Sequence, residues 1–199
     1  MTTLATADLT QARKYFERTR YRIGETVRNL SEPQWRFKPD PETWSIAENL
    51  EHMVTVHENV LAMLQKNLAQ APAPPPGYDT QTIDGIILEK IPDRSKKTKM
   101  PEHLPQPTGQ WSIGSALERL ATNFERLSEF VESTPHVRDH VLDSPPLRFV
   151  TNGAHQIMDG FQWALAVAAH DERHLNQILE LQADPRYISH ASLSAAVSA

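Results

Sequence analysis

Residues 161–178 read Phe-Gln-Trp-Ala-Leu-Ala-Val-Ala-Ala-His-Asp-Glu-Arg-His-Leu-Asn-Gln-Ile, an uninterrupted helical pattern with two histidines four positions apart. At about 100° per residue, one stripe of this helix collects both imidazoles and several apolar side chains: Trp163, Ala166, Val167, His170, His174 and Leu181. A buried imidazole needs a partner for each ring nitrogen. Two imidazoles one turn apart can bind one metal ion, or each can form hydrogen bonds to a neighbouring helix. The pair alone leaves both interpretations open.

The composition narrows the classes of protein to which the chain can belong. Its 199 residues suit a single domain spanning 1–199, and 20 Lys and Arg against 25 Asp and Glu give a net charge of −5. A mildly acidic chain of this kind is not expected to bind nucleic acid or a membrane surface, which both favour a basic face. The chain has no cysteine and nine histidines, so any metal site must use nitrogen and oxygen ligands.

The amino terminus has no basic segment followed by a long apolar run, so we expect no signal peptide. No apolar stretch approaches the roughly 18–20 residues that a membrane-spanning helix needs. We therefore expect a cytoplasmic protein.

Hydrophobic periodicity predicts four long helices, at about 7–30, 45–69, 112–132 and 161–178. Ser45 stands three residues before Glu48, a capping-box pattern that marks the start of the second helix. Between the second and third helices, residues 70–112 form a long proline-rich crossover loop with a short helix at about 83–91, which is typical of a functional lid or a bundle crossover. Its run 94–99 is interpreted as a solvated charge cluster, with an anionic ligand as the alternative. Residues 135–160 are expected to be irregular and the tail 186–199 flexible. The fold class is all-α, a four-helix bundle.

Two histidines compete for the inward position on the second helix. His57 lies within the apolar stripe, whereas His52 lies about 140° from its centre, so periodicity alone favours His57. His136 and His140 are also four apart, but they lie in the expected irregular region, and we interpret them as surface residues.

Two stretches together resemble the DinB superfamily, which includes YfiT-like metal-dependent hydrolases and bacillithiol S-transferases. They are Trp-Ser-Ile-Ala-Glu-Asn-Leu-Glu-His at 44–52 and His-Asp-Glu-Arg-His-Leu-Asn-Gln-Ile at 170–178. The resemblance extends through Asp93-Arg94-Ser95, the segment to Trp111, and Trp163. It implies a bundle with up-down-down-up connectivity and one divalent metal held by His52, His170 and His174. The resemblance, not the periodicity, thus selects His52 over His57.

Three neutral imidazoles would leave a coordination position open, as in catalytic zinc sites. Such an ion could activate water or bind a low-molecular-weight thiol as thiolate. The glutamate that follows the first histidine of the zincin motif is replaced by Asp171, which argues against a peptidase. Zinc, nickel, iron and copper all suit such ligands.

Residues expected to support the ligands are Glu48, Arg173 and Gln177, although the capping box by itself would explain Glu48. The leading hypothesis is a metal-dependent enzyme, a thiol-dependent S-transferase or a hydrolase, that acts on a small-molecule substrate. The alternatives are a non-catalytic metal-containing binding or stress-response protein, and a bundle whose histidines only fill the core. A homodimer is compatible with the sequence.

Overall fold

The computed structural model describes residues 6–95 and 105–187, and its architecture is a four-helix bundle with a smaller helical and hairpin region on one side. The long helices are α1 (Thr6–Val27), α3 (Ile46–Asn67), α5 (Ile113–Ser133) and α7 (Gly160–Gln182). The shorter elements are α2 (Glu32–Trp35), η1 (Leu68–Gln70), α4 (Thr80–Lys90), β1 (Val141–Asp143), α6 (Pro145–Val150) and β2 (Ile157–Asp159). Each predicted long helix is present, within a few residues of its expected ends.

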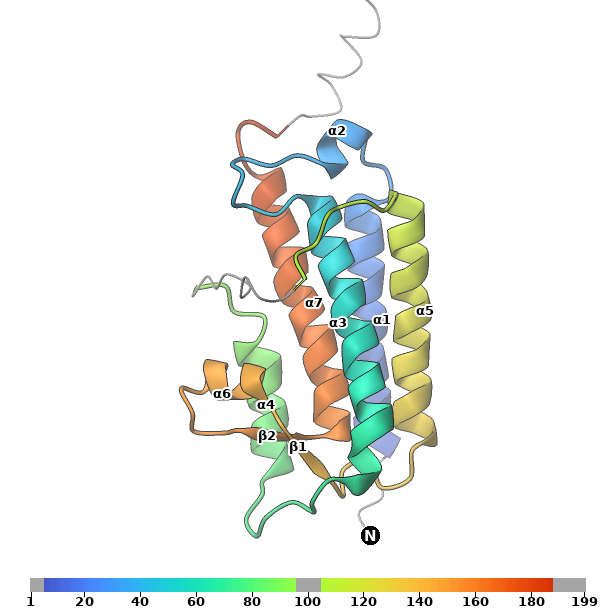
Figure 1. Cartoon of the computed structure of the whole chain (residues 1–199), viewed down its shortest axis with the longest axis vertical. Helices are drawn as coiled ribbons and strands as arrows, with labels where there is room; N and C mark the ends of the chain where they lie inside the picture. The colour runs from blue at the N-terminus through green and yellow to red at the C-terminus, as the bar shows by residue number, and fades with distance from the viewer. Residues whose placement is uncertain (1–5, 96–104, 188–199) are drawn as a thin grey trace, which may run out of the picture.

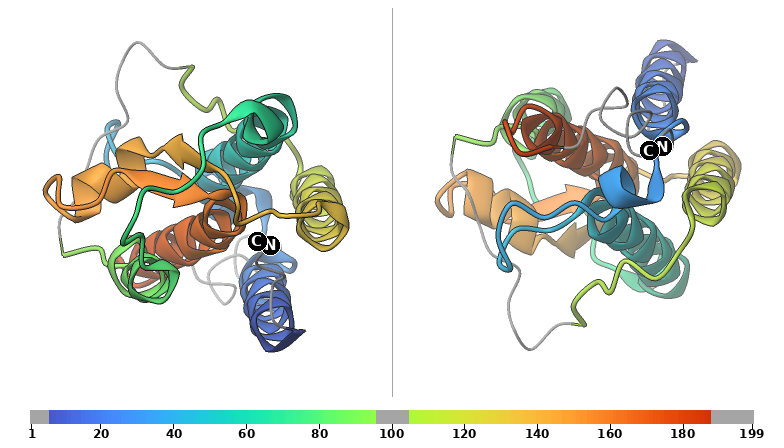
Figure 2. Two further views of the ribbon diagram at one scale, coloured as in Figure 1. Left: turned by 90° about the horizontal axis from the view of Figure 1, so that it is seen from below. Right: turned by 90° about the horizontal axis from the view of Figure 1, so that it is seen from above.

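The four long helices form a ring in which sequence neighbours are not always packed together. In Figure 1 the chain rises along α1, descends along α3 and α5, and rises along α7. Helix α3 packs between α5 and α7, and α1 packs on the same two helices from the other side. The α4 helix, α6 and the two strands lie on the side of the bundle opposite α5 (Figures 1 and 2). Helices α3 and α7 therefore face one another along the bundle.

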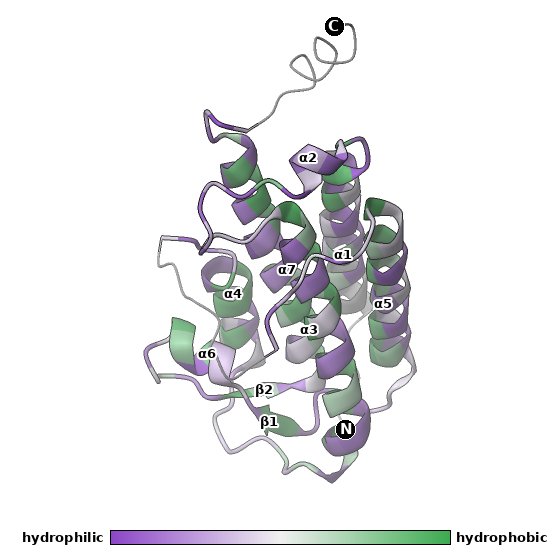
Figure 3. Cartoon of the chain, turned by 45° about the horizontal axis from the view of Figure 1, so that its top comes forward, coloured by the Kyte–Doolittle hydropathy of each residue, from purple (hydrophilic) through white to green (hydrophobic). Residues whose placement is uncertain are grey.

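Local signals explain where the helices begin. The Ser45 side chain accepts a hydrogen bond from Glu48 N, and Glu48 Oε2 accepts one from Ser45 N, which completes the expected capping box of α3. Ser112 caps α5 through Ser115 N. Figure 3 shows hydrophilic and hydrophobic residues alternating along the long helices, as one buried face per helix requires. The largest fully buried side chains come from the long helices and from α2, α4, α6 and β2: Trp35, Ile23, Ile46, Leu50, Met53, Leu64, Ile87, Leu120, Leu127, Leu147, Met158 and Leu175.

The expectation that residues 135–160 are irregular is wrong for 141–143, 145–150 and 157–160, which form strands or helices, and correct for the turns between them. Strands β1 and β2 pair antiparallel, with Leu142 opposite Met158, and α6 lies between them in the sequence. Each strand has only three residues, too short for an alternating pattern to be recognised. The α6 helix starts with two prolines after the cap Ser144, so its prolines mark the start of a helix instead of a loop.

The crossover between α3 and α5 is bound to the bundle near its C-terminal end, just before α5. Glu51 of α3 is 8% exposed, and its Oε2 accepts hydrogen bonds from the backbone N–H groups of Thr108, Gly109 and Gln110 at 3.1, 2.6 and 3.3 Å. Gly109 has φ +67°, and a Cβ there would lie 3.2 Å from the Ala47 Cβ. This close approach and the positive φ favour glycine at position 109.

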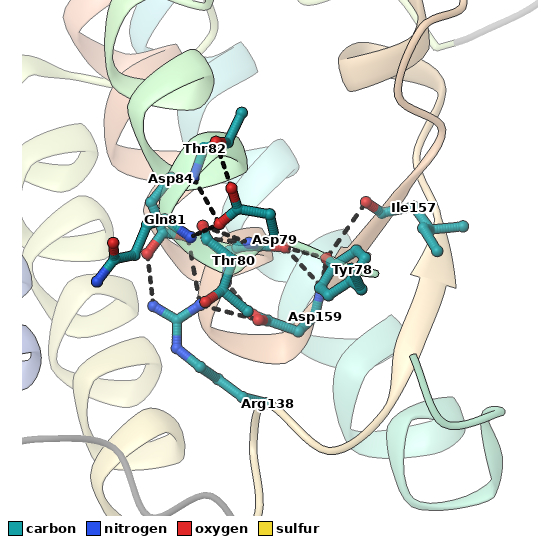
Figure 4. Close-up of polar contacts among 10 residues, drawn as sticks. Tyr78, Asp79, Thr80, Gln81, Thr82, Asp84, Arg138, Ile157 and Asp159 are labelled. Carbon is teal, nitrogen blue, oxygen red and sulfur yellow. Dashed lines mark hydrogen bonds and ion pairs between the residues drawn. The ribbon is translucent and has the colours of Figure 1, made fainter. Parts of the chain in front are cut away.

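A set of buried and partly buried polar side chains, which we call the arginine cluster, attaches α4 and the β1–β2 strand pair to the start of α7 (Figure 4). It comprises Arg138, Asp159, Asp84, Gln162 and Tyr78. Arg138 Nη1 donates to Asp159 Oδ2 at 2.8 Å and Nη2 to Asp84 Oδ2 at 2.6 Å. Gln162 Nε2 donates to Asp84 Oδ1 at 2.9 Å, and the Tyr78 hydroxyl donates to Gln162 Oε1. The cluster thus joins three segments distant in sequence.

Several expectations fall partly outside the described residues. Residues 96–99 of the charged run and residues 188–199 of the tail lie there. Across 6–95 and 105–187, no helix is both long and apolar enough to cross a membrane.

Candidate metal centre

Helices α3 and α7 bring three histidines together in the bundle. The Nε2 atoms of His52 and His170 are 3.2 Å apart, and those of His170 and His174 are 3.1 Å apart. One ligand atom from each of the three lies within 4.8 Å of the others. The helical spacing of four residues places His170 and His174 on one face of α7, and α3 supplies the third ring from across the interface. We call these residues the histidine cluster.

The spacing of the cluster and the pKa values of His52 and His174 fit a transition metal. Zn–N bonds of 2.0–2.1 Å in tetrahedral geometry would place ligand nitrogens about 3.3 Å apart, close to the observed separations. Burial lowers the pKa of His52 to about 3, and the neighbouring His170 adds to the shift. Burial also holds the pKa of His174 well below its ordinary value, with further contributions from His170, His52, Arg94 and Arg173. Imidazoles that stay neutral keep the lone pair that a metal requires.

The site is largely buried, but one side of it is open to solvent. The His174 residue is 7% exposed, whereas the His170 side chain is 23% exposed, so solvent reaches one side of the cluster. The Trp44 ring stacks near the His174 ring with 6.0 Å between centroids, and it lies 4.8 Å from the His52 ring. An apolar wall and an open side are typical of a site that admits a small ligand.

Asn49 fixes the orientation of His174. Asn49 Nδ2 donates to Ser45 O at 2.8 Å, which turns Oδ1 toward His174, and His174 Nδ1 donates to that oxygen at 2.9 Å. The proton is therefore on Nδ1, and the Nε2 lone pair points into the cluster. Ligating histidines in proteins almost always have such a partner on the outer nitrogen.

His57 lies outside the histidine cluster and is more deeply buried than its members. It is fully buried, and its Nε2 donates to Asp171 Oδ2 at 2.7 Å. Its ring contacts Phe124 edge-on, with centroids 4.9 Å apart. Burial would raise the pKa of Asp171, but the His57 and His170 imidazoles hold it below its ordinary value. Both histidines of α3 thus turn toward α7, on adjacent faces.

The three expected supporting residues have other contacts. Glu48 completes the capping box, and its Oε1 accepts from Lys38 Nζ at 2.9 Å. Gln177 Oε1 accepts from Arg94 Nη1 at 2.9 Å, and Arg173 donates to the carbonyl of Asp93. The crossover therefore lies against α7 one turn beyond His174.

The other histidine pair does not form a site of this kind. His136 is exposed and its Nδ1 lies 2.9 Å from Asp139 Oδ2, while His140 Nδ1 donates to Ala71 O at 2.6 Å. Position 136 has φ 59°, so the pair is not helical and its spacing does not align the rings.

Sequence reasoning missed two residues that contact the cluster, Asn49 and Asp171. Asn49 is a fully buried polar residue, one turn before His52 on a helix whose inner face is apolar. A polar residue at such a position was the available signal. Asp171 directly follows His170, and no periodicity argument separates it from a surface acid.

Three comparisons show which known proteins the chain resembles. The sequence model described as the DinB superfamily matches residues 15–178. The uncharacterized protein YuaE of Bacillus subtilis (strain 168) is 28% identical over 169 residues, which cover 84% of this chain and 94% of YuaE. Among solved structures, YfiT from Bacillus subtilis superimposes with a TM-score of 0.58 at 12% identity, over 92% of this chain and 90% of YfiT. YfiT is described as a probable metal-dependent hydrolase with an unusual four-helix bundle topology.

Proposed function

Because this chain belongs to the DinB superfamily, we propose that it is a metal-dependent hydrolase of small molecules, with one divalent transition metal held by His52, His170 and His174. The observation that carries the proposal is the convergence of three Nε2 atoms, 3.1 and 3.2 Å apart, at the α3–α7 interface. The description of YfiT as a probable metal-dependent hydrolase supports the choice of reaction class.

The donor set favours catalysis over a structural role for the metal. Structural zinc sites use four protein ligands, whereas three leave room for a water or a substrate. A bound divalent ion supplies Lewis acidity, which lowers the pKa of water and polarises a carbonyl or phosphoryl oxygen.

The remaining tasks fall to the chain's own residues. Asn49 holds the proton of His174 on Nδ1 and keeps its Nε2 free to ligate. Trp44 covers one side of the His52 and His174 rings and excludes water from it. The exposed side of His170 is where a substrate would approach.

Metal binding is tested first, on protein purified without a histidine tag. We expect about one zinc, nickel or iron per chain by elemental analysis, and a sharp loss of metal in His52→Ala. His140→Ala is the matched control, because it removes a partly buried imidazole that lies outside the cluster and should leave the metal content unchanged. Unchanged metal content in His52→Ala would contradict the ligand assignment.

The reaction class is tested next on the metal-loaded protein. Hydrolysis of a simple ester or amide that disappears in His174→Ala supports the proposal. In cobalt-substituted protein, a thiol-induced near-ultraviolet charge-transfer band, with transfer to an electrophile and no hydrolysis, would instead identify a thiol-dependent transferase. Metal binding without either activity would leave a non-catalytic binding protein.

A further inference from the structure

Two unsatisfied buried atoms face each other beside the histidine cluster. His170 Nδ1 and Asp171 Oδ1 are both buried, neither has a hydrogen-bond partner, and they lie 3.8 Å apart. That separation is too long for a hydrogen bond. Buried polar atoms without partners are uncommon in proteins and call for an explanation.

Metal ligation would give each atom a partner. A histidine that ligates through Nε2 carries its proton on Nδ1, and that N–H must donate to an acceptor. Among the described residues, Asp171 is the carboxylate that lies within ion-pair distance of the His170 ring. Closing the gap to about 2.8 Å, the usual length of a hydrogen bond to a carboxylate, needs a movement of about 1 Å.

The carboxylate is itself held in place. Asp171 is fully buried, and the Nε2–H group of His57 donates to its other oxygen at 2.7 Å. His57 comes from α3 and is also fully buried, so the pair spans the same interface as the cluster. The order His57, Asp171, His170 thus leads from the core to the proposed ion.

We propose that Asp171, anchored by His57, is a positioning residue that hydrogen-bonds His170 Nδ1 when the metal is bound and so strengthens metal binding. The inference rests on the proposed metal site but not on the reaction that the metal catalyses. A partner of this kind fixes the tautomer and the ring orientation of the ligand and raises its basicity.

The first test is metal affinity by chelator competition, which needs no substrate. Asp171→Asn keeps the shape but loses the charge, and we expect about 10- to 100-fold weaker zinc binding. Asp159→Asn is the matched control, because Asp159 is also a fully buried carboxylate next to α7 but belongs to the arginine cluster. We expect its folded form to bind zinc within about twofold of wild type. Equal affinities for wild type and Asp171→Asn would overturn the inference and leave the metal site intact.

Changing the anchor provides a second test if Asp171→Asn does not fold. His57→Gln retains an N–H donor for Asp171, whereas His57→Phe keeps an aromatic ring against Phe124 without one. We expect weaker zinc binding in His57→Phe and affinity near wild type in His57→Gln. Equal affinities in the two variants would show that His57 acts only in packing and would remove the anchor from the inference.

Nuclear magnetic resonance of the zinc form reports the hydrogen bond directly. The His170 ring should show a protonated Nδ1 whose proton is shifted downfield and exchanges slowly with solvent, and Asp171→Asn should move it upfield. A rapidly exchanging Nδ1 proton in the wild type would contradict the inference. If wild-type protein binds no divalent metal, the proposed function itself fails, which the chelator titration distinguishes from loss in the variants alone.

Discussion

Two polar clusters adjoin the same helix, α7, and they differ in how their buried groups are satisfied. At its start, Arg138 forms ion pairs with both Asp159 and Asp84, so each of these charged groups has an oppositely charged partner within the protein (Figure 4). Three turns on, the histidine cluster directs three Nε2 atoms at one another without an opposite charge between them. A closed set of partners serves to attach segments, whereas converging lone pairs call for a ligand. We therefore interpret the arginine cluster as structural and propose a functional role for the histidine cluster.

The largest effect is expected from breaking the arginine cluster. Arg138→Met would leave Asp159 buried without its cation, and removing one partner of a buried ion pair costs about 3–5 kcal/mol. Urea unfolding of the metal-free protein measures this loss, while zinc affinity of the folded fraction should stay unchanged. The double variant Arg138→Met with Asp159→Leu should recover part of the stability. A loss below about 1 kcal/mol in the single variant would contradict the assigned role.

Removing a histidine of the cluster should have the opposite effect: zinc binding should weaken, while the stability of the metal-free protein should hardly change. His170→Ala removes one of three proposed ligands, so zinc affinity should fall more than about 100-fold. The free energy of unfolding of the metal-free protein should change by less than about 1 kcal/mol, because the buried Asp171 keeps its hydrogen bond from His57 Nε2. Chelator competition and urea unfolding measure the two quantities on one preparation. A large loss of stability with retained zinc binding would reverse the distinction between the clusters.

Acid should act on the two clusters with opposite signs. The pKa of His52 is about 3 and that of His174 lies well below 6.5, so on acidification from pH 6.5 the unfolded chain binds protons that the folded metal-free protein does not. Their contribution to stability therefore falls as the pH decreases. Burial raises the pKa of Asp159 to about 6 despite Arg138, so the folded protein takes up this proton first and the contribution of Asp159 rises between pH 6 and 4.

Two histidines act against one aspartate, so we expect the free energy of unfolding of the metal-free protein to fall as the pH decreases from 6 to 4. Urea unfolding of chelator-treated protein across this range tests the slope. His52→Phe should flatten it, and Asp159→Asn should make it steeper. Equal slopes in the wild type and both variants would contradict the assigned signs.

The smallest effect is expected at the outer partner of His174. Asn49→Leu removes the acceptor for Nδ1–H, and we expect about 10-fold weaker zinc binding. Asn123, another buried amide, donates to Val54 O at 3.4 Å, so Asn123→Leu is the matched control. Equal zinc affinities in these two variants would show that the Asn49 contact does not orient the ring.

Much of the bundle follows from local patterns. The stripe of α7, the capping box of Ser45 and Glu48, and the cap at Ser112 each involve residues within a few positions, so the sequence alone indicates where these helices begin. The strands β1 and β2 could not be recognised in this way, because three residues show no periodicity and their pairing depends on a partner 14 to 18 positions away.

The candidate site likewise combines local features, which the sequence predicts, with contacts between distant segments, which it does not. The spacing of His170 and His174 on one helix is local, so the sequence by itself determined that their rings share a face. The choice between His52 and His57 depends on where α7 lies relative to α3, which a helical wheel drawn for one helix does not contain. The partners of Asp171 and Arg138 likewise come from segments 114 and 54 positions away. Only the tertiary structure decides such contacts, because burial and pairing energies depend on which surfaces meet, not on the order of residues along one chain segment.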